Sequence, residues 1–162
     1  MESHMSREMK RFNHLLGEID AVYHAAALKM GLSDSAMSIL YTISNEGDAC
    51  LLQTICRRSG LNKQTVNSAL RKLERERVIY RESAGPKVKR VCLTEQGKTL
   101  ARRTAHRIIQ AENEILTSWS AEDVEAYLTL TERFLQAIRE KTQDLVLEEV
   151  INGGGPPEKG EV

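Results

Sequence analysis

The side chains of this chain with the clearest chemistry are basic, and they gather in one stretch of the sequence. Between Leu51 and Arg107 there are 15 Lys and Arg residues against 4 Asp and Glu, whereas the rest of the chain has 8 against 19. The formal net charge is therefore zero, although one segment is strongly basic. A folded basic surface between acidic flanks favours a partner made of phosphates.

The most informative part of this segment follows Asn62, a residue type that commonly caps helices. Beyond it, Val66, Ala69, Leu70 and Leu73 recur at helical offsets, which predicts a helix with one buried face. The opposite face has no acid and no large apolar side chain. It carries amide, hydroxyl and cationic groups, which can pair with base edges and phosphate oxygens in a major groove.

The candidate DNA contacts on this helix divide by chemistry. The side chains expected to contact bases are Gln64, Asn67, Ser68 and Arg71. The side chains expected to contact the phosphate backbone are Lys63, Thr65 and Lys72.

Two neighbouring patterns frame this helix. A short helix is expected over 51–58, and Gly60 marks the turn between the two helices, an arrangement typical of a helix-turn-helix. Downstream, the β-branched and aromatic runs 78–80 and 91–93 predict a two-stranded hairpin, or wing, around the turn 83–86. The tip of this wing is expected to carry three further candidate DNA contacts, Lys87, Lys89 and Arg90.

The segment from about Leu51 to Ala101 resembles the winged helix-turn-helix of the MarR family of transcriptional regulators. The resemblance lies in the run 55–66, in Leu70-Arg71-Lys72-Leu73-Glu74, and in the run 91–97 with its Leu-Thr-Glu-x-Gly pattern. It implies a homodimeric DNA-binding protein, most simply a repressor, with a pseudo-palindromic operator. It also implies release by a small aromatic or anionic effector.

The wing departs from the family pattern. Many members carry Asp-x-Arg where this chain has Gly85-Pro86-Lys87, so the acid that usually braces the loop is missing and Lys replaces Arg. Lys is a point charge that cannot make the bidentate contacts of Arg. We therefore expect a shorter wing that contacts phosphates but grips the duplex more weakly.

Long helices are expected on both sides of the winged segment. An apolar stripe from Phe12 to Met30 predicts a first helix, and Ser33 can cap a second. Thr94 can cap one long helix that runs to Trp119, and Ser120 can open a last helix. The fold class expected is mainly α with a small β-hairpin wing.

The expected domain organisation follows from these elements. Residues 32–107 form the DNA-binding lobe, and residues 6–31 with 108–151 form a helical dimerisation region, because such elongated amphipathic helices need a partner. Residues 1–5 resemble a cloning remnant or a disordered start. Residues 152–162 are expected to form a flexible tail.

The resemblance also implies an effector site between the dimer helices and the DNA-binding lobe. Polar or adaptable side chains of the first, second and fifth helices are the candidates, although the same residues could serve the dimer interface. They are His14, Tyr23, His24, Met37, Tyr41, Arg103 and Arg107.

The cysteines leave a redox-responsive regulator open as an alternative. It would act through Cys56, expected on the inner face of its helix, or through Cys92, expected to face outward from the wing. By the resemblance, Cys50 aligns with a position that is buried and apolar in the MarR family. A second alternative is a winged helix used for protein contacts, which would need an apolar patch on the outward face after Asn62.

Other classes find no support in the sequence. No Gly-rich phosphate loop, nucleophile with a base motif or metal-ligand cluster is present, so we expect neither an enzyme nor a bound metal or cofactor. No apolar run approaches the roughly 18 residues of a membrane span. The three cysteines are an odd number at spacings that fit no disulfide framework, and no secretory signal is recognisable. Both observations favour the cytoplasm.

Overall fold

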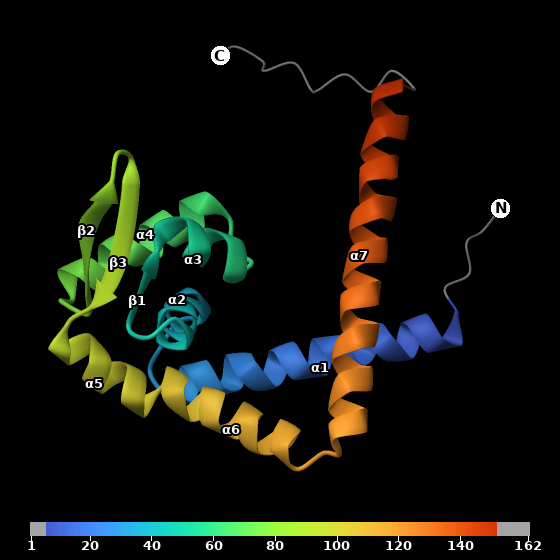
Figure 1. Ribbon diagram of the computed structural model, residues 1–162, viewed down its shortest axis with the longest axis horizontal. Helices are drawn as coiled ribbons and strands as arrows, with labels where there is room; N and C mark the ends of the chain where they lie inside the picture. The colour runs from blue at the N-terminus through green and yellow to red at the C-terminus, as the bar shows by residue number, and fades with distance from the viewer. Residues whose placement is uncertain (1–5, 152–162) are drawn as a thin grey trace. The chain divides into compact units, whose positions relative to one another are not determined.

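A computed structural model describes residues 6–151 of the chain, with side chains as far as residue 145 (Figure 1). The expected cloning remnant at residues 1–5 and the expected tail at 152–162 lie outside the described residues. By their contacts, the residues up to Glu112 and those from Asn113 onward form two compact units, which are described separately. The boundary falls within a helix, α6.

The described chain is mainly helical with one small antiparallel sheet, as the sequence predicts. The elements in chain order are α1 (Arg7–Lys29), α2 (Asp34–Asn45), β1 (Ala49–Leu51), α3 (Leu52–Arg58), α4 (Lys63–Arg75), β2 (Ile79–Gly85), β3 (Val88–Leu93), α5 (Glu95–Arg103), α6 (Ala105–Thr117) and α7 (Ala121–Ile151). We call the part from α2 to α5 the winged lobe.

Side-chain caps fix the starts of the helices where the sequence predicts them. Asn62 Oδ1 accepts a hydrogen bond from the Thr65 amide at 2.8 Å, which begins α4. The hydroxyls of Ser33, Thr94 and Ser120 accept equivalent bonds at 3.2, 2.9 and 3.1 Å. By contrast, α3 begins after Leu51 with no side-chain cap, because Leu cannot accept a hydrogen bond.

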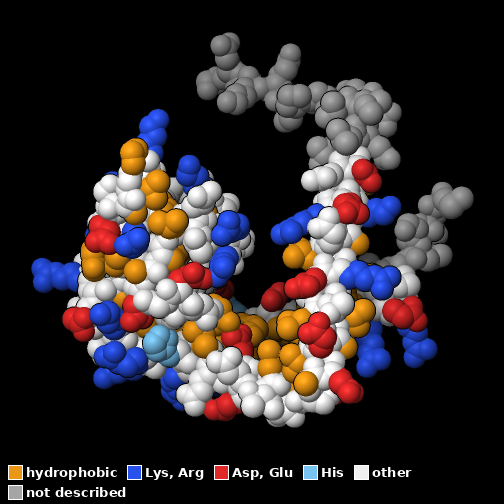
Figure 2. Space-filling model, in the orientation of Figure 1, with side chains coloured by type: hydrophobic (Ala, Val, Ile, Leu, Met, Phe, Trp, Pro, Cys, Tyr) orange, Lys and Arg blue, Asp and Glu red, His pale blue; other side chains and the backbone are white. Residues whose placement is uncertain are grey.

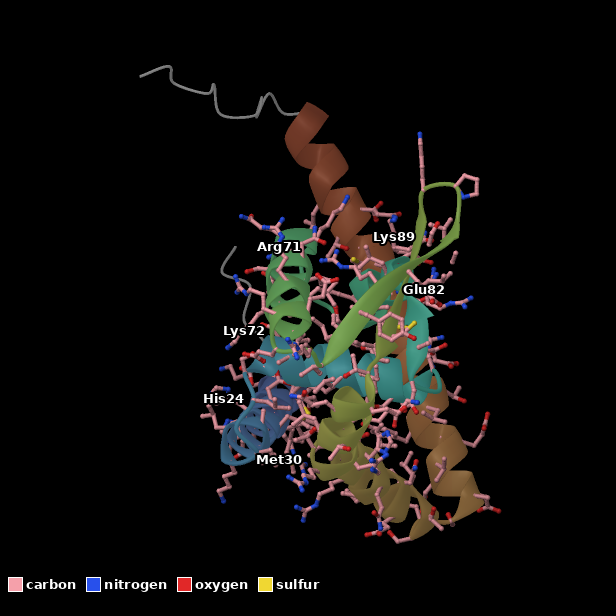
Figure 3. The ribbon with its side chains drawn as sticks, turned by 90° about the vertical axis from the view of Figure 1, so that its left-hand side faces the viewer. His24, Met30, Arg71, Lys72, Glu82 and Lys89 are labelled. Atoms are coloured by element: carbon pink, nitrogen blue, oxygen red, sulfur yellow. The ribbon has the colours of Figure 1, made fainter. Side chains whose placement is uncertain are left out.

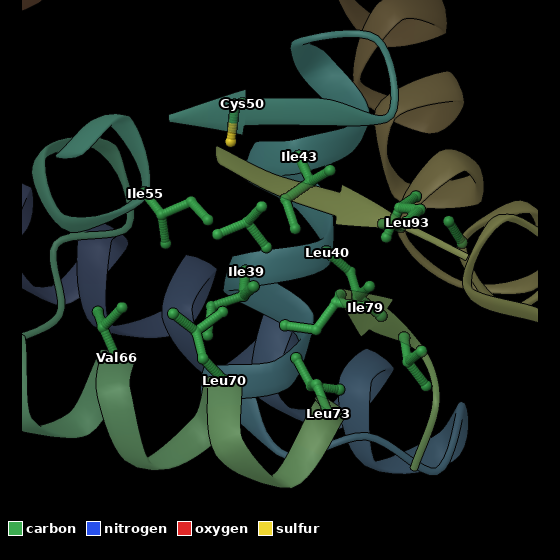
Figure 4. Packing of buried hydrophobic residues seen from close by; sticks show 14 residues of the cluster. Ile39, Leu40, Ile43, Cys50, Ile55, Val66, Leu70, Leu73, Ile79 and Leu93 are labelled. Atoms are coloured by element: carbon green, nitrogen blue, oxygen red, sulfur yellow. The ribbon is translucent and has the colours of Figure 1, made fainter. Parts of the chain in front are cut away.

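One apolar core holds the winged lobe together (Figure 4). From α4, Val66, Leu70 and Leu73 are at most 2% exposed, and they pack toward α2 and the sheet. The side chains that meet them include Ile39, Leu40 and Ile43 of α2, all completely buried, with Ile79 and Leu93 from the strands. The buried face of α4 is therefore the one that the sequence predicts.

The sheet has a third strand that the sequence pattern does not reveal. Its order is β1-β3-β2, and β1 pairs with β3 so that Cys50 lies opposite Val91. Because β1 is only three residues long, it carries no readable alternation. This strand ties the base of the β2–β3 hairpin to the helix-turn-helix, since α3 follows β1 directly.

The single long helix expected from Thr94 to Trp119 is wrong, because it is interrupted at Thr104. There the backbone turns to φ −127° and ψ −92°, which separates α5 from α6. The buried Thr104 hydroxyl donates to the carbonyl oxygen of Leu100 at 2.7 Å, a bond of the kind that competes with helix geometry. The apolar pattern continues across the break, so periodicity alone could not show it.

The unit from Asn113 onward contains the end of α6 and all of α7. The Ser120 cap begins α7, which extends over 31 residues. Near its start, the Trp119 and Tyr127 rings meet edge to face with their centroids 5.4 Å apart.

Gly97 in α5 should be irreplaceable because of a close backbone approach. A Cβ atom at this position would lie 1.9 Å from the carbonyl oxygen of Val78. We expect Gly97→Ala to lower the free energy of unfolding by about 2 to 3 kcal/mol through overpacking, measured by urea denaturation.

Gly17→Ala is the matched control, because a Cβ there meets nothing within 4 Å on a helical stretch of α1. It should be neutral or stabilise by up to about 1 kcal/mol. Equal stability of Gly97→Ala and the wild type would refute the packing described for α5.

Candidate nucleic-acid interface

The outward face of α4 is polar and basic. Lys63, Gln64, Ser68, Arg71 and Lys72 are exposed on it, whereas Thr65 and Asn67 are half-buried at its edges. Arg71 and Lys72 project away from the helix (Figure 3). Because Asn62 caps α4, the helix is regular from its first turn. A regular helix with these side chains on its outward face could enter the major groove of a duplex.

The charges on this face are largely uncommitted. Within the described residues, Lys63 and Arg71 take part in no ion pair or side-chain hydrogen bond. Lys72 lies 3.9 Å from the Glu76 carboxylate, and both side chains are more than half exposed. Such a long surface pair is worth little and can be exchanged for a phosphate at low cost.

The wing is a hairpin with a tight turn. Gly85 of β2 pairs with Val88 of β3, which leaves only Pro86 and Lys87 between them. Pro86 in the first central position and Lys87 at φ +58° in the second match a type II turn. A cationic side chain projects from the tip of the hairpin on the face that Figure 2 shows.

The three basic residues predicted at the wing tip do not lie together. Lys87 lies in the turn, whereas Lys89 and Arg90 are successive residues of β3 and so point to opposite faces of the hairpin. Lys89 shares its face with Val91, which is buried in the core of the lobe. Arg90 lies on the other face, with its Nη1 atom 3.6 Å from the Glu82 carboxylate.

Further cationic side chains of the basic segment are paired with acids of the winged lobe, among them Arg58, Arg81 and Lys98. Arg58 at the end of α3 is paired with Glu46. Arg81 of β2 makes a two-pronged contact with Glu74 of α4, with N···O distances of 2.8 and 2.7 Å. The sequence shows the excess of positive charge but not which residues are already neutralised.

Among the expected effector residues, the structure brings Tyr23 and Tyr41 together. Both phenol hydroxyls donate to the carboxylate of Glu112, one to each oxygen. Burial, followed by the hydrogen bond to Glu112, raises the pKa of Tyr41 to about 12. Sequence reasoning did not find Glu112, because a single acid on a charged helix has no pattern that distinguishes it.

For the other expected effector residues, all within the described part of the chain, the structure shows no contact with Glu112. His24 Nδ1 is 2.7 Å from the Asp34 carboxylate, and His14 is 3.5 Å from Glu18 one turn along α1. Met37 packs against the core, while Arg103 and Arg107 are exposed on either side of the Thr104 break.

Cys92 lies on the outer face of the hairpin, as expected, but it is covered there. Its side chain is only 5% exposed, with the Sγ atom 3.6 Å from Glu82, and desolvation is the main cause that raises its pKa. Desolvation also raises the pKa of Cys50 to about 11. Buried thiols held in the protonated form are poor nucleophiles, which argues against the redox alternative for these two residues. Cys56 is half-buried against the core.

The described residues contain no group of three His, Cys, Asp or Glu side chains placed to hold a metal ion. None of the helices in residues 6–151 is both long and apolar enough to span a bilayer.

A polar and basic helix face, held beside a basic hairpin by one shared core, defines a winged helix-turn-helix protein. Comparison with known families gives a match to the MarR family model over residues 30–90, from the end of α1 into β3. This match agrees with the resemblance that the sequence shows to the MarR family of transcriptional regulators. No curated protein matches the chain in sequence.

Several solved structures share this fold. A MarR family transcriptional regulator from Silicibacter pomeroyi is 21% identical, with a TM-score of 0.63 over 78% of this chain and 86% of that one. The S. aureus MepR–DNA complex is 18% identical, with a TM-score of 0.61 over 83% of this chain and 99% of that one. Bordetella bronchiseptica BpsR is 17% identical, with a TM-score of 0.56 over 76% and 98%.

The raised pKa of Tyr41 predicts a loss of stability at alkaline pH. Because the folded-state pKa of about 12 exceeds the ordinary value of 10.0, this phenol stabilises the fold below pH 10 and ceases to do so as the pH rises toward 12. In urea denaturation, the advantage of the wild type over Tyr41→Phe should shrink by about 1 kcal/mol between pH 9 and pH 11.

Tyr127→Phe, which removes an exposed phenol from the other unit, controls for general alkaline effects. A pH-independent difference between wild type and Tyr41→Phe would contradict the described environment of Tyr41.

Proposed function

We propose that the chain is a dimeric, sequence-specific regulator that binds double-stranded DNA, acts as a repressor and is released by a small-molecule effector. The observation that carries the proposal is the acid-free outward face of α4. A function in binding DNA also implies the cytoplasm as its compartment. The S. aureus MepR–DNA complex offers a precedent for duplex binding by this fold.

In this proposal α4 is the recognition helix and lies in the major groove. Gln64, Asn67, Ser68 and Arg71 contact base edges, because amide and guanidinium groups match the donor and acceptor patterns of adenine and guanine. Lys63, Thr65 and Lys72 contact the phosphate backbone and set the register of the helix.

The wing adds contacts beside the recognition helix. In this proposal Lys87 at the turn and Lys89 on the core-side face of β3 contact phosphates that flank the major groove. Arg90 is the weakest of the three candidates, since it faces the other way and is paired with Glu82.

Exposed apolar side chains support the dimer. On α1, Leu15, Leu16, Ile19 and Tyr23 are 44–47% exposed, and Val22 is 69% exposed. On α7, the exposed large hydrophobics are Tyr127, Leu128, Leu130, Phe134, Leu135, Ile138 and Leu145. Such exposed apolar faces are typical of a subunit interface. A two-fold dimer would place two copies of α4 about 34 Å apart along a pseudo-palindromic operator.

An effector would act through the cluster of Tyr23, Tyr41 and Glu112. The DNA binding of Bordetella bronchiseptica BpsR is regulated by 6-hydroxynicotinic acid, which is a precedent for small-molecule control in this fold. Here an anionic effector would have to displace or neutralise the Glu112 carboxylate, because it already accepts both phenol hydroxyls. It shifts DNA binding only by its differential affinity for the two states.

The protein-interaction alternative lacks the feature it requires. An apolar patch would have to occupy the outward face of α4, and the exposed residues there are Lys, Gln, Ser and Arg.

Replacement of Arg71 and Lys87 should separate base reading from backbone contact. With DNA selected by the wild type from a random duplex pool, Arg71→Ala should cost about 1 to 3 kcal/mol and relax sequence choice at one position. Lys87→Ala should weaken binding to selected and random duplexes alike. It should also reduce the slope of log binding constant against log salt concentration by about 0.9. Equal losses of specific and non-specific binding in both variants would contradict this division of roles.

Replacement of Ile19 should test the dimer. Ile19→Asp puts a charge on the apolar face of α1 and should yield monomers in light scattering, with weakened binding to the selected operator. Leu28→Asp is the matched control, because Leu28 is 59% exposed and lies two and a half helical turns further on, on the opposite face. A dimer that survives Ile19→Asp unchanged would exclude α1 as its interface.

A further inference from the structure

The basic segment contains one ion pair with a geometry unlike that of the others. Arg81 donates to Glu74 through Nε and Nη2, to one carboxylate oxygen each, at 2.8 and 2.7 Å. This parallel arrangement is the strongest and most directional form of an Arg–carboxylate contact. The wing pair of Arg90 and Glu82, by comparison, is 3.6 Å apart.

The pair joins the two elements that are proposed to contact DNA. Glu74 lies in the last turn of α4, and Arg81 lies on β2 of the wing. Their side chains are only 33% and 26% exposed, so water screens the contact less than it screens most surface pairs. The hydrogen bond from Arg81 is the main cause that lowers the pKa of Glu74, so the carboxylate stays charged at neutral pH.

The backbone between the two residues is folded tightly and directs β2 back toward α4. The Arg77 amide donates to the Glu74 carbonyl at 3.0 Å, and the Val78 amide donates to the Leu73 carbonyl at 2.9 Å. Arg77 itself adopts φ +59°. The side-chain pair closes the loop that begins here, which leaves little freedom for the root of the wing.

Strand pairing carries this constraint to the basic residues of the wing. Arg81 lies opposite Val91 of β3, so both side chains are on the core-side face of the hairpin. Lys89 is two residues from Val91 on that same face, and the turn with Lys87 lies just beyond. When Glu74 holds Arg81, it therefore also holds the face of the hairpin that carries Lys89.

We propose that Glu74 and Arg81 form a clamp that sets the position of the wing relative to the recognition helix, so that both are positioning residues for DNA binding. This inference rests on the proposed function. In this inference the negatively charged Glu74 promotes binding to DNA, although DNA is itself negatively charged. The clamp also supplies at the root of the wing the bracing that the Gly85-Pro86-Lys87 turn lacks at its tip.

Simple electrostatics makes the opposite prediction, which allows a decisive test. Glu74→Gln removes one negative charge and frees Arg81, so charge alone predicts tighter binding and a steeper salt slope. The clamp predicts weaker binding, by about tenfold on the selected operator, and a shallower salt slope because wing contacts are lost. Arg81→Lys keeps the charge but loses the two-pronged geometry, and it should weaken binding similarly.

Glu82→Gln is the matched control. It makes the same change in charge on the same hairpin, but on the face away from the core, where its partner is Arg90. Binding by this variant should be unchanged or tighter. The double variant Glu74→Arg, Arg81→Glu restores an ion pair and should recover binding to within about threefold of the wild type.

The experiment measures affinity, salt slope and hydroxyl-radical footprints on the selected operator, with circular dichroism to establish folding. The clamp predicts that Glu74→Gln and Arg81→Lys lose protection at the outer, wing-contacted positions and keep it at the centre, and that the double variant regains it. Binding by Glu74→Gln as tight as that by Glu82→Gln, or no recovery in the double variant, overturns the clamp alone. A wild type that binds no duplex overturns the proposed function and the clamp with it.

Discussion

The burial of one side of α4 is the interaction on which the structure depends. Val66, Leu70 and Leu73 are at most 2% exposed in the core of the winged lobe, and each contributes roughly 1.5 to 3 kcal/mol. A helix turns by a fixed angle per residue, so burying this face also determines which side chains face solvent. The direction of Asn67 and Arg71 is therefore a consequence of packing, and the core of the lobe defines its outer surface.

A second constraint is the way in which the basic segment distributes its charge. Arg58 and Arg81 are paired with acids of the winged lobe, and Arg90 is paired with Glu82 on the face of the wing away from the core. Lys63 and Arg71 remain without such partners among the described residues. The internal pairs join one element to another, while the uncommitted cations lie on surfaces that a duplex could reach. Net charge thus overstates how many residues serve binding.

Features that depend on neighbours in sequence were predictable from the chain. The Asn62, Thr94 and Ser120 caps and the apolar face of α4 follow from local chemistry and a 3.6-residue period. Features that depend on distant contacts were not. The three-residue strand β1, the burial of Cys92 on the outer face of the hairpin, the meeting of Tyr23 and Tyr41 at Glu112, and the pairing of Glu74 with Arg81 all arise from tertiary packing.

The structure of the protein bound to a duplex selected from a random pool tests the central claim most directly. The account predicts that α4 lies in the major groove with its Val66 face still buried and with Asn67 and Arg71 within hydrogen-bonding distance of base edges. A complex in which the duplex meets another surface, with the outward side chains of α4 facing solvent, would contradict it.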